Sequence, residues 1–287
     1  MRLMFVHGIA QGGKDPGVLT SEWLGALKEG LTRAGMDLPP NVEVDFPFYA
    51  DRLDQFVEEF GLPSDASVLP KGSPVDKEYE QFRIRVAEEI RVRRGISDQQ
   101  IRQEIPNTTL EKGVQNWAWV QAILRLVDKQ VPDLTQTTLE VFLRDVFLYT
   151  QREVVQKAID KIVAEKLTQD TLVVVGHSLG SVVAYNVLKT AGYKVPLFVT
   201  VGSPLGISTI NKTVRPLCNP AGSGGWYNAY DKHDVVALYP LDSDHFGVSP
   251  AITNNGSVEN WTSNKHGIIG YLDDANVAAA ICSGLAS

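Results

Sequence analysis

The feature that most restricts the possible folds of this chain is an apolar segment that runs directly into a serine flanked by glycines. Residues 172–175 are Leu-Val-Val-Val, which is typical of a strand that is covered on both faces. The pentapeptide Gly-His-Ser-Leu-Gly follows at 176–180, and residues 181–188 form a helix-compatible run. A strand that turns so sharply into a helix strains the backbone at Ser178 and leaves no room for side chains at the two glycines. The sequence therefore predicts that Ser178 stands clear of a sheet, near the positive end of a helix.

Outside one long block, apolar segments of strand length alternate with amphipathic segments of helix length. This alternation predicts a three-layer α/β/α sandwich around a mostly parallel sheet of about six strands. We expect one domain over residues 1–287. Strands are expected at 3–6, 42–46, 172–175, 197–201, 226–230 and 258–261, and the last helix at 267–281.

The block from about 51 to 134 has no strand-like alternation and predicts a mainly helical insertion. Two interpretations of its aromatic residues stay open: a lid over an acyl chain, or the core of a helical subdomain. These residues are Phe56, Phe60, Tyr79, Phe82, Trp117 and Trp119. Five arginines between 83 and 94 are interleaved with Glu88 and Glu89, which favours a solvent-exposed helix face over an anion site.

Charge and composition narrow the classes of protein that this chain can be. A hydrophobic content of 44% and a net charge of −7 fit a globular protein and argue against a nucleic-acid binder, which needs a basic face. No apolar run approaches the roughly 18 residues that span a bilayer, and the N-terminal residues lack a secretory signal. We therefore expect a cytoplasmic protein. The two cysteines, Cys218 and Cys282, are too few for a metal cluster.

A serine hydroxyl becomes an effective nucleophile only when an oriented base takes its proton. On a sheet of this type, an acid and then a histidine follow the serine along the chain. Of the five histidines, His266 lies between the last expected strand and the last helix, so it is the candidate base. Asp234 is the favoured acid, because two valines follow it and can begin a buried stretch. Asp231, which directly follows the strand at 226–230, is the alternative acid.

Acyl transfer also needs two backbone N–H groups that face the developing oxyanion. One is expected from Leu179, the residue after the nucleophile. The other is expected from the loop that follows the first strand, where Ile9 is the first candidate and Ala10 and Gln11 are its neighbours.

Five segments together resemble the α/β-hydrolase superfamily, closest to its lipase and esterase-like branch. They are Val6-His7-Gly8-Ile9, the pentapeptide at 176–180, Val201-Gly202-Ser203-Pro204, residues 231–234 and His266-Gly267. The resemblance implies that Ser203 and Pro204 line the site. Two features depart from the family pattern: the chain starts at the strand that precedes His7, which implies a reduced sheet, and the insertion follows the second strand.

The resemblance implies a serine hydrolase that cleaves a small-molecule or lipid-like carboxylic ester through an acyl-enzyme on Ser178, without a metal or an organic cofactor. An amidase, a thioesterase or an acyltransferase with the same residues stays open, as does a non-catalytic binding protein with this fold. The helical insertion is also open as an interaction surface. The sequence does not indicate an oligomeric state.

Overall fold

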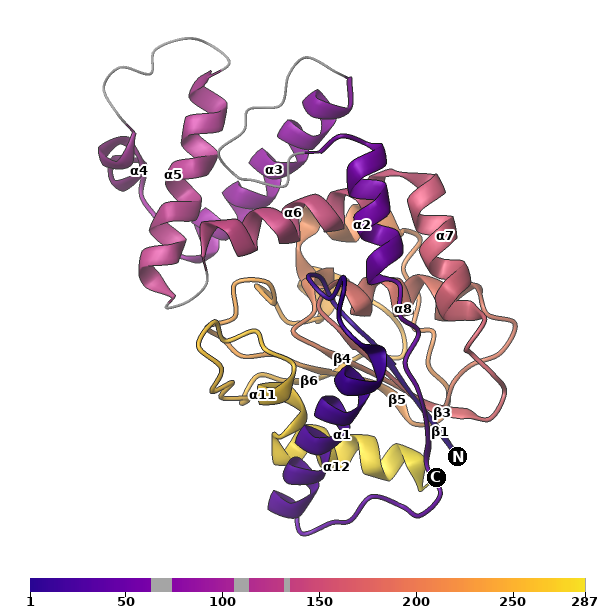
Figure 1. Ribbon diagram of the computed structural model, residues 1–287. Helices are drawn as coiled ribbons and strands as arrows, with labels where there is room; N and C mark the ends of the chain where they lie inside the picture. Colours follow the sequence, from indigo (N-terminus) through magenta and orange to yellow (C-terminus); the bar gives the residue numbers. More distant parts are fainter. Residues whose placement is uncertain (63–73, 106–113, 132–134, 287) are drawn as a thin grey trace.

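The computed structural model describes residues 1–62, 74–105, 114–131 and 135–286, and its centre is one six-stranded sheet (Figure 1). The strand order is β2-β1-β3-β4-β5-β6, and every neighbouring pair is parallel. The predicted α/β fold with about six mostly parallel strands is thus confirmed. The strands are β1 (Arg2–Val6), β2 (Glu43–Asp45), β3 (Thr171–His177), β4 (Leu197–Val201), β5 (Gly225–Ala229) and β6 (Thr253–Asn255).

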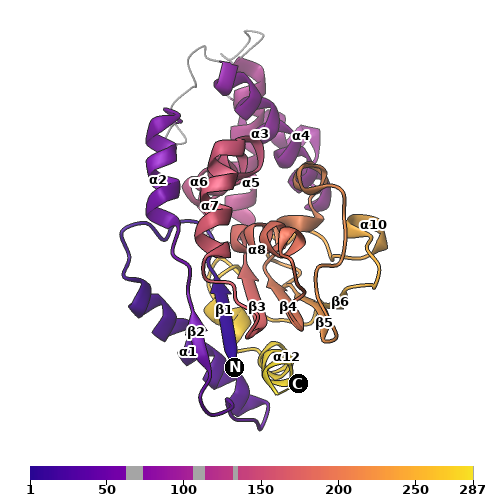
Figure 2. The same cartoon turned by 90° about the vertical axis from the view of Figure 1, so that its right-hand side faces the viewer.

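Helices cover both faces of the sheet because successive strand residues point to opposite sides. Leu3 and Phe5 pack toward α1 (Pro16–Arg33) and α12 (Ala275–Leu285). Met4 and Val6 pack into the other cluster, which includes α7 (Glu153–Ala164) and α8 (Leu179–Thr190). The two helical layers are seen on either side of the sheet in Figure 2. The shorter elements are η1 (Pro204–Gly206), α9 (Ser208–Asn211), η2 (Lys212–Val214), α10 (Ser243–Phe246) and α11 (Ile269–Leu272).

Two expected elements near the C-terminus are wrong. Residues 258–261 form a loop, and the last strand is β6. In this loop Asn260 is buried by polar contacts, with its N–H bonded to the Asp231 carboxylate, while Trp261 is 58% exposed, so the segment is held by a loop contact and not by strand pairing. The last helix is divided into α11 and α12, because Asp274 accepts hydrogen bonds from the N–H groups of residues 276 and 277 and begins a new helix.

The block that the sequence marks as an insertion is mainly helical in its described residues, where its helices are joined by turns and short loops. Its helices are α2 (Ala50–Glu59), α3 (Pro74–Arg93), α4 (Asp98–Glu104) and α5 (Val114–Gln130), and α6 (Gln136–Gln151) follows them. Figures 1 and 2 show these helices on the side of the sheet that α8 covers, beyond the ends of the strands. Their buried side chains join the same apolar cluster as those of α8, so this block and the sheet share one core.

The aromatic residues of this block are mostly core residues. Phe56, Tyr79 and Phe82 are at most 2% exposed, and Tyr79 and Phe82 pack on Phe147 of α6. Phe60 and Trp119 are partly buried against the same cluster. The side chain of Trp117 lies outside the described residues. This packing fits the core of a helical subdomain.

The expectation of a solvent-exposed arginine face is wrong for part of α3. Arg83 is 1% exposed and pairs with Glu140 of α6, because α3 packs against α5 and α6. Arg91 pairs with Glu88 and Asp98 near the helix end.

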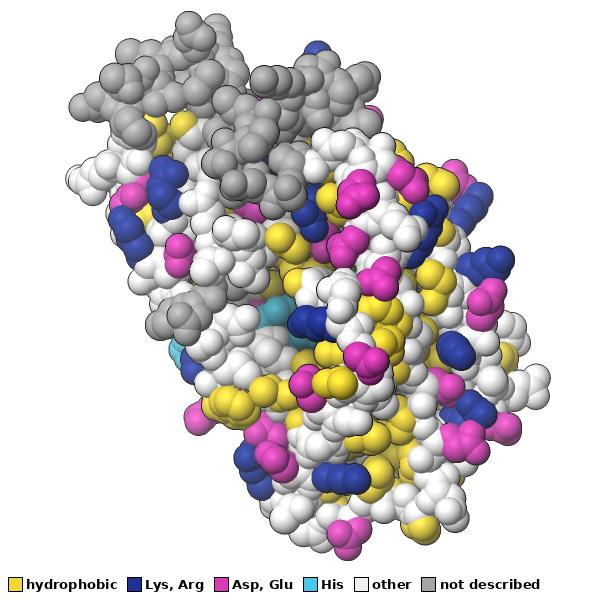
Figure 3. Space-filling view, viewed as in Figure 1, with side chains coloured by type: hydrophobic (Ala, Val, Ile, Leu, Met, Phe, Trp, Pro, Cys, Tyr) yellow, Lys and Arg dark blue, Asp and Glu magenta, His cyan; other side chains and the backbone are white. Residues whose placement is uncertain are grey.

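Acidic and basic side chains are interspersed over the face shown in Figure 3, and histidine side chains are seen in a hollow near its middle. Across the described residues, we find no helix with the length and apolar character needed to cross a membrane. Both cysteines are free thiols; Cys218 is exposed and Cys282 is buried.

Candidate active site

Ser178 lies in the sharp turn between β3 and α8, with φ +53° and ψ −129°. A positive φ is strained for a residue with a side chain, so the surrounding structure must hold it. A Cβ on Gly180 would lie 2.2 Å from the Val6 carbonyl oxygen, and one on Gly176 would lie 2.6 Å from Cα of Ser181. Both flanking glycines are therefore required by the close approach of backbone, as the sequence suggests.

The structure brings Asp234 and His266 together. The Nδ1 atom of His266 lies 2.7 Å from Oδ2 of Asp234. A carboxylate only accepts hydrogen bonds when it is ionised, so Nδ1 carries the proton and Nε2 is left with a free lone pair. Burial alone would raise the pKa of Asp234, but His266, the Tyr271 hydroxyl and the Val236 amide outweigh it, and the pKa is lower than its ordinary value. Asp234 therefore stays ionised beside the imidazole.

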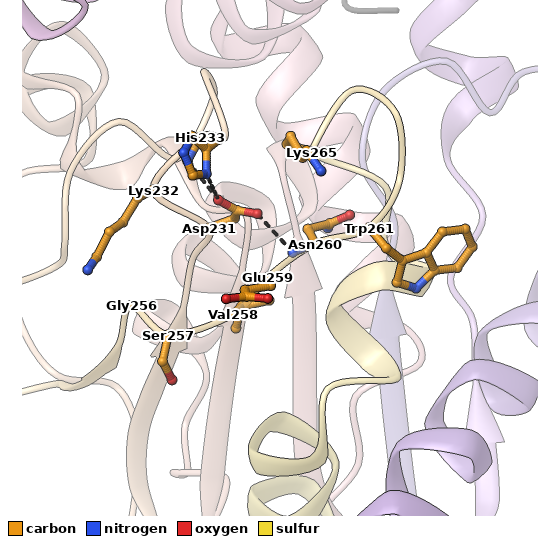
Figure 4. A pocket seen from close by; sticks show the side chains of 10 residues that line it. All are labelled: Asp231, Lys232, His233, Gly256, Ser257, Val258, Glu259, Asn260, Trp261 and Lys265. Atoms are coloured by element: carbon orange, nitrogen blue, oxygen red, sulfur yellow. Dashed lines mark hydrogen bonds and ion pairs between the residues drawn. The ribbon is translucent and has the colours of Figure 1, made fainter. Parts of the chain in front are cut away.

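Asp231 has a different set of partners. Its carboxylate accepts hydrogen bonds from the backbone N–H groups of His233 (2.7 Å) and Asn260 (2.8 Å), and it also contacts the His233 ring (3.1 Å). Figure 4 shows Asp231 between these two residues, at an open pocket of about 710 Å³. Asp231 thus joins two loops, and of the two candidate acids only Asp234 is hydrogen-bonded to His266 among the described residues.

Ser178 and His266 both contact the segment at the end of β4. The Ser178 N–H donates to the Val201 carbonyl oxygen (3.2 Å). The next residue, Gly202, lies against the His266 ring, since a Cβ on it would be 3.1 Å from Cε1. The His177 ring centre is 4.8 Å from that of His266.

Two buried polar atoms at this point have no hydrogen-bond partner among the described residues: Oγ of Ser178 and Nε2 of His266. Such atoms are rare in folded proteins, because each one costs about 1–3 kcal/mol of desolvation. The Ser178 hydroxyl and the His266 Nε2 lone pair are therefore both left with unused hydrogen-bonding capacity at this point.

The loop that follows β1 lies directly against the serine. A Cβ on Gly8 would be 2.9 Å from Cβ of Ser178. The backbone N–H of the next residue, Ile9, has no acceptor among the described residues, and Ala10 has φ +57°. Leu179 is the first residue of α8, so its N–H lacks an acceptor within the helix. Both candidate oxyanion donors are thus one residue along the chain from Ser178 or from Gly8, which lies against it, and the helix and the loop leave their N–H groups unused.

His7 and His177 support the site as neutral side chains. The Nε2 atom of His7 accepts from the Tyr49 N–H (3.1 Å), and its Nδ1 donates to the Gly8 carbonyl oxygen (2.8 Å). The Nε2 of His177 donates to the carbonyl oxygen of His266 (2.8 Å). Burial lowers the pKa of His7 to about 4. Burial, and to a smaller extent the charge of His266, lowers the pKa of His177 to about 3. Neither is therefore suited to act as the base.

We expect this burial to appear in the pH dependence of stability. Glutamine at position 177 keeps an amide donor for the His266 carbonyl but does not titrate. Because the pKa of His177 is lower in the folded protein, its contribution to stability is complete above pH 6.5 and is lost as the pH falls toward 3. The unfolding free energy of the wild type relative to His177→Gln should therefore decrease by about 2 kcal/mol between pH 6.5 and pH 5. Urea titrations at both pH values measure it, and a constant difference would contradict the burial of a neutral ring.

Two residues that the sequence does not mark, Tyr271 and Asn260, hold the site. The Tyr271 hydroxyl donates to Oδ2 of Asp234 (2.6 Å), the same oxygen that contacts His266. The Asn260 side chain donates to the Gly267 carbonyl oxygen (2.8 Å) and so fixes the loop that carries His266. Neither contact has a signal in the sequence, because Tyr271 bonds to a residue 37 positions away and Asn260 bonds across a loop whose path the sequence does not give.

The remaining candidates lie around the site rather than in it. Ser203 is buried and hydrogen-bonded to Ser181. The Ser181 hydroxyl donates to the Ser178 carbonyl oxygen (2.6 Å), so Ser203 supports the serine turn through Ser181. His233 has a 76% exposed side chain. His245 lies on α10, where it contacts Asp242 and stacks on Tyr239.

Comparisons of this chain with protein-family models, with curated proteins and with solved structures found no match.

Proposed function

We propose that this protein is a serine hydrolase of the α/β-hydrolase type that cleaves a carboxylic ester. The observation that carries the proposal is the pair of unsatisfied buried atoms, Oγ of Ser178 and Nε2 of His266, with Asp234 bonded to the other side of the imidazole. A non-catalytic binding protein would have no use for a strained serine beside an oriented base. The strain at Ser178 supports the same conclusion, because such strain is concentrated at functional sites.

In the proposed reaction, the Ser178 oxygen attacks the ester carbonyl carbon while Nε2 of His266 takes the hydroxyl proton. The N–H groups of Ile9 and Leu179 hold the oxyanion, and the loss of one such donor typically costs about 3 kcal/mol. The tetrahedral intermediate then expels the alcohol, which receives the proton from His266. Water attacks the acyl-enzyme with His266 again as the base, and the carboxylic acid leaves. Asp234 orients the imidazole and stabilises its charged form throughout.

A fluorophosphonate probe tests this proposal directly. We expect the folded protein to be phosphonylated once, with fragment-ion mass spectrometry placing the added mass on Ser178 and not on Ser181 in the same peptide. Heat-denatured protein is the control and should remain unlabelled, because the free serine hydroxyl is a weak nucleophile. A folded protein that does not react would favour a binding protein.

A substrate panel on the active protein then separates the acyl-transfer reactions that share these residues. The proposed ester activity requires faster turnover of p-nitrophenyl esters than of matched anilides and thioesters. A chain-length series of the esters distinguishes small-molecule from lipid-like substrates.

A further inference from the structure

The C-terminal end of α3 is bonded to the loop that carries Asp234. We call residues 231–238 the acid loop. The guanidinium of Arg94 donates to the His233 carbonyl oxygen, and Nε of Arg93 donates to the Leu238 carbonyl oxygen (3.0 Å). Along the chain, His233 comes directly before Asp234 and Leu238 comes four residues after it. The two arginines are about 140 residues away along the chain, so this contact exists only in the folded molecule.

Glu89, within α3, fixes the helix to the neighbouring loop. The Glu89 carboxylate accepts hydrogen bonds from the N–H groups of Ser208 (2.7 Å) and Thr209 (2.9 Å), and from the Thr209 hydroxyl (2.7 Å). These residues begin α9, which follows β4, whereas the acid loop follows β5. Hydrogen bonds with an ionised partner are roughly twice as strong as neutral ones. One helix of the insertion therefore holds the loops after two adjacent strands of the catalytic sheet.

Arg94 lies near both carboxylates of the acid loop. Its partial burial lowers the pKa of its guanidinium, whereas the carboxylates of Asp234 and Asp231 act in the opposite direction. Inside the acid loop, Asp234 is held by hydrogen bonds between its carboxylate and the N–H groups of Val236 (2.8 Å) and Ala237 (3.3 Å). Those bonds fix the carboxylate relative to its own loop. The arginines fix the loop relative to the rest of the protein.

We propose that Arg93 and Arg94 are positioning residues, through which the helical insertion holds Asp234 against His266. The inference rests on the proposed function, since it assigns the insertion a role in orienting the acid of that site. Catalytic groups must be held within about 0.5 Å of their working geometry, and a displacement of about 1 Å can cost 10²-fold in rate. The insertion is thus part of the catalytic framework and not only a cover over it.

The chain offers a matched control for this inference. Arg91 lies on the same helix but pairs with Glu88 and Asp98 inside the insertion. For Arg94→Met we expect kcat for p-nitrophenyl acetate to fall by about 10²-fold with KM little changed. Arg91→Met should keep kcat within about threefold of wild type, because its contacts do not reach the acid loop. Arg94→Lys should recover part of the loss, since an ammonium group can still donate to the His233 carbonyl.

Proton NMR reads the same contact without depending on turnover. The proton between Nδ1 of His266 and Asp234 should give a low-field signal in the wild type and in Arg91→Met, and a shifted or lost signal in Arg94→Met. If the kinetic constants and this signal are the same in Arg94→Met and Arg91→Met, the inference is overturned. If Arg94→Met does not fold, Arg93→Met compared with Arg91→Met decides by the same signal, because Arg93 holds the other side of the acid loop through the Leu238 carbonyl oxygen. A wild type that shows the signal but does not react with the fluorophosphonate would instead contradict the proposed function.

Discussion

Ser178→Ala is expected to reduce the turnover of an activated p-nitrophenyl ester by about 10⁶-fold, the scale of loss when the nucleophile of a serine–histidine–aspartate site is removed. Alanine removes the attacking oxygen and leaves Asp234, His266 and the N–H groups of Ile9 and Leu179 in place. The residual rate over water should come from those donors and from substrate binding. Initial rates with wild-type and variant protein at equal concentration measure the effect.

A neighbouring serine is the control for this variant. Ser181→Ala removes a buried hydroxyl three residues away, one that donates to the Ser178 carbonyl oxygen and is hydrogen-bonded to the Ser203 hydroxyl. It should lower the rate by no more than about tenfold, because it loses a supporting hydrogen bond of roughly 1 kcal/mol. If Ser178→Ala is folded by circular dichroism and keeps more than a hundredth of the activity, another group is the nucleophile.

Asp234→Asn is expected to reduce kcat by about 10⁴-fold, whereas Asp231→Asn should leave kcat within about tenfold of wild type. The carboxylate of Asp234 accepts on both oxygens: Oδ2 from His266 and Tyr271, and Oδ1 from the Val236 N–H. An asparagine must turn its NH₂ group toward one of these sets of donors. If the NH₂ faces His266, the imidazole has to present Nδ1 as an acceptor and carry its proton on Nε2. It then no longer serves as a base toward Ser178.

Asp231→Asn should act on stability instead. Asp231 accepts from the N–H groups of His233 and Asn260, and an amide satisfies only one of them well. We expect a loss of about 1–3 kcal/mol in the free energy of unfolding, measured by urea denaturation, from the donor that is left unpaired. Steady-state kinetics on both folded variants compare them. If Asp231→Asn damages kcat more than Asp234→Asn, Asp231 is the acid and the site has to be reassigned.

Local pattern was sufficient to predict the central part of the fold. The strand, the serine turn and the helix that follows it depend only on neighbouring residues: the apolar run at 172–175, the glycines at 176 and 180, and the helical run after them. The same holds for β1, β4 and β5, whose apolar segments are bounded by turn residues. At 258–261 the predicted strand is wrong, because Asn260 is held by hydrogen bonds to Asp231 and Gly267 and not by strand pairing. The four residues alone do not reveal these partners.

Part of the candidate site could likewise be predicted from the sequence, and part could not. Chain order selected Ser178 and His266 and narrowed the acid to two residues of one turn. The separation of Asp234 from Asp231 needed the fold, since both are buried and lie three residues apart. The contacts of His177 with the His266 carbonyl and of Tyr271 with Asp234 join segments that have no sequence relation.

The serine turn and the sheet around it were determined by the sequence, because strand, turn and helix preferences depend on residues within a few positions of one another. The tertiary structure decided which aspartate orients His266, which histidines are buried and neutral, and what the arginines of α3 contact. Arg83 and Arg94 belong to one basic segment, yet the first pairs with Glu140 inside the insertion and the second bonds to the acid loop. A charged helix face contains no information about its partner until the chain is folded, because the partner lies on a distant segment that only packing brings near.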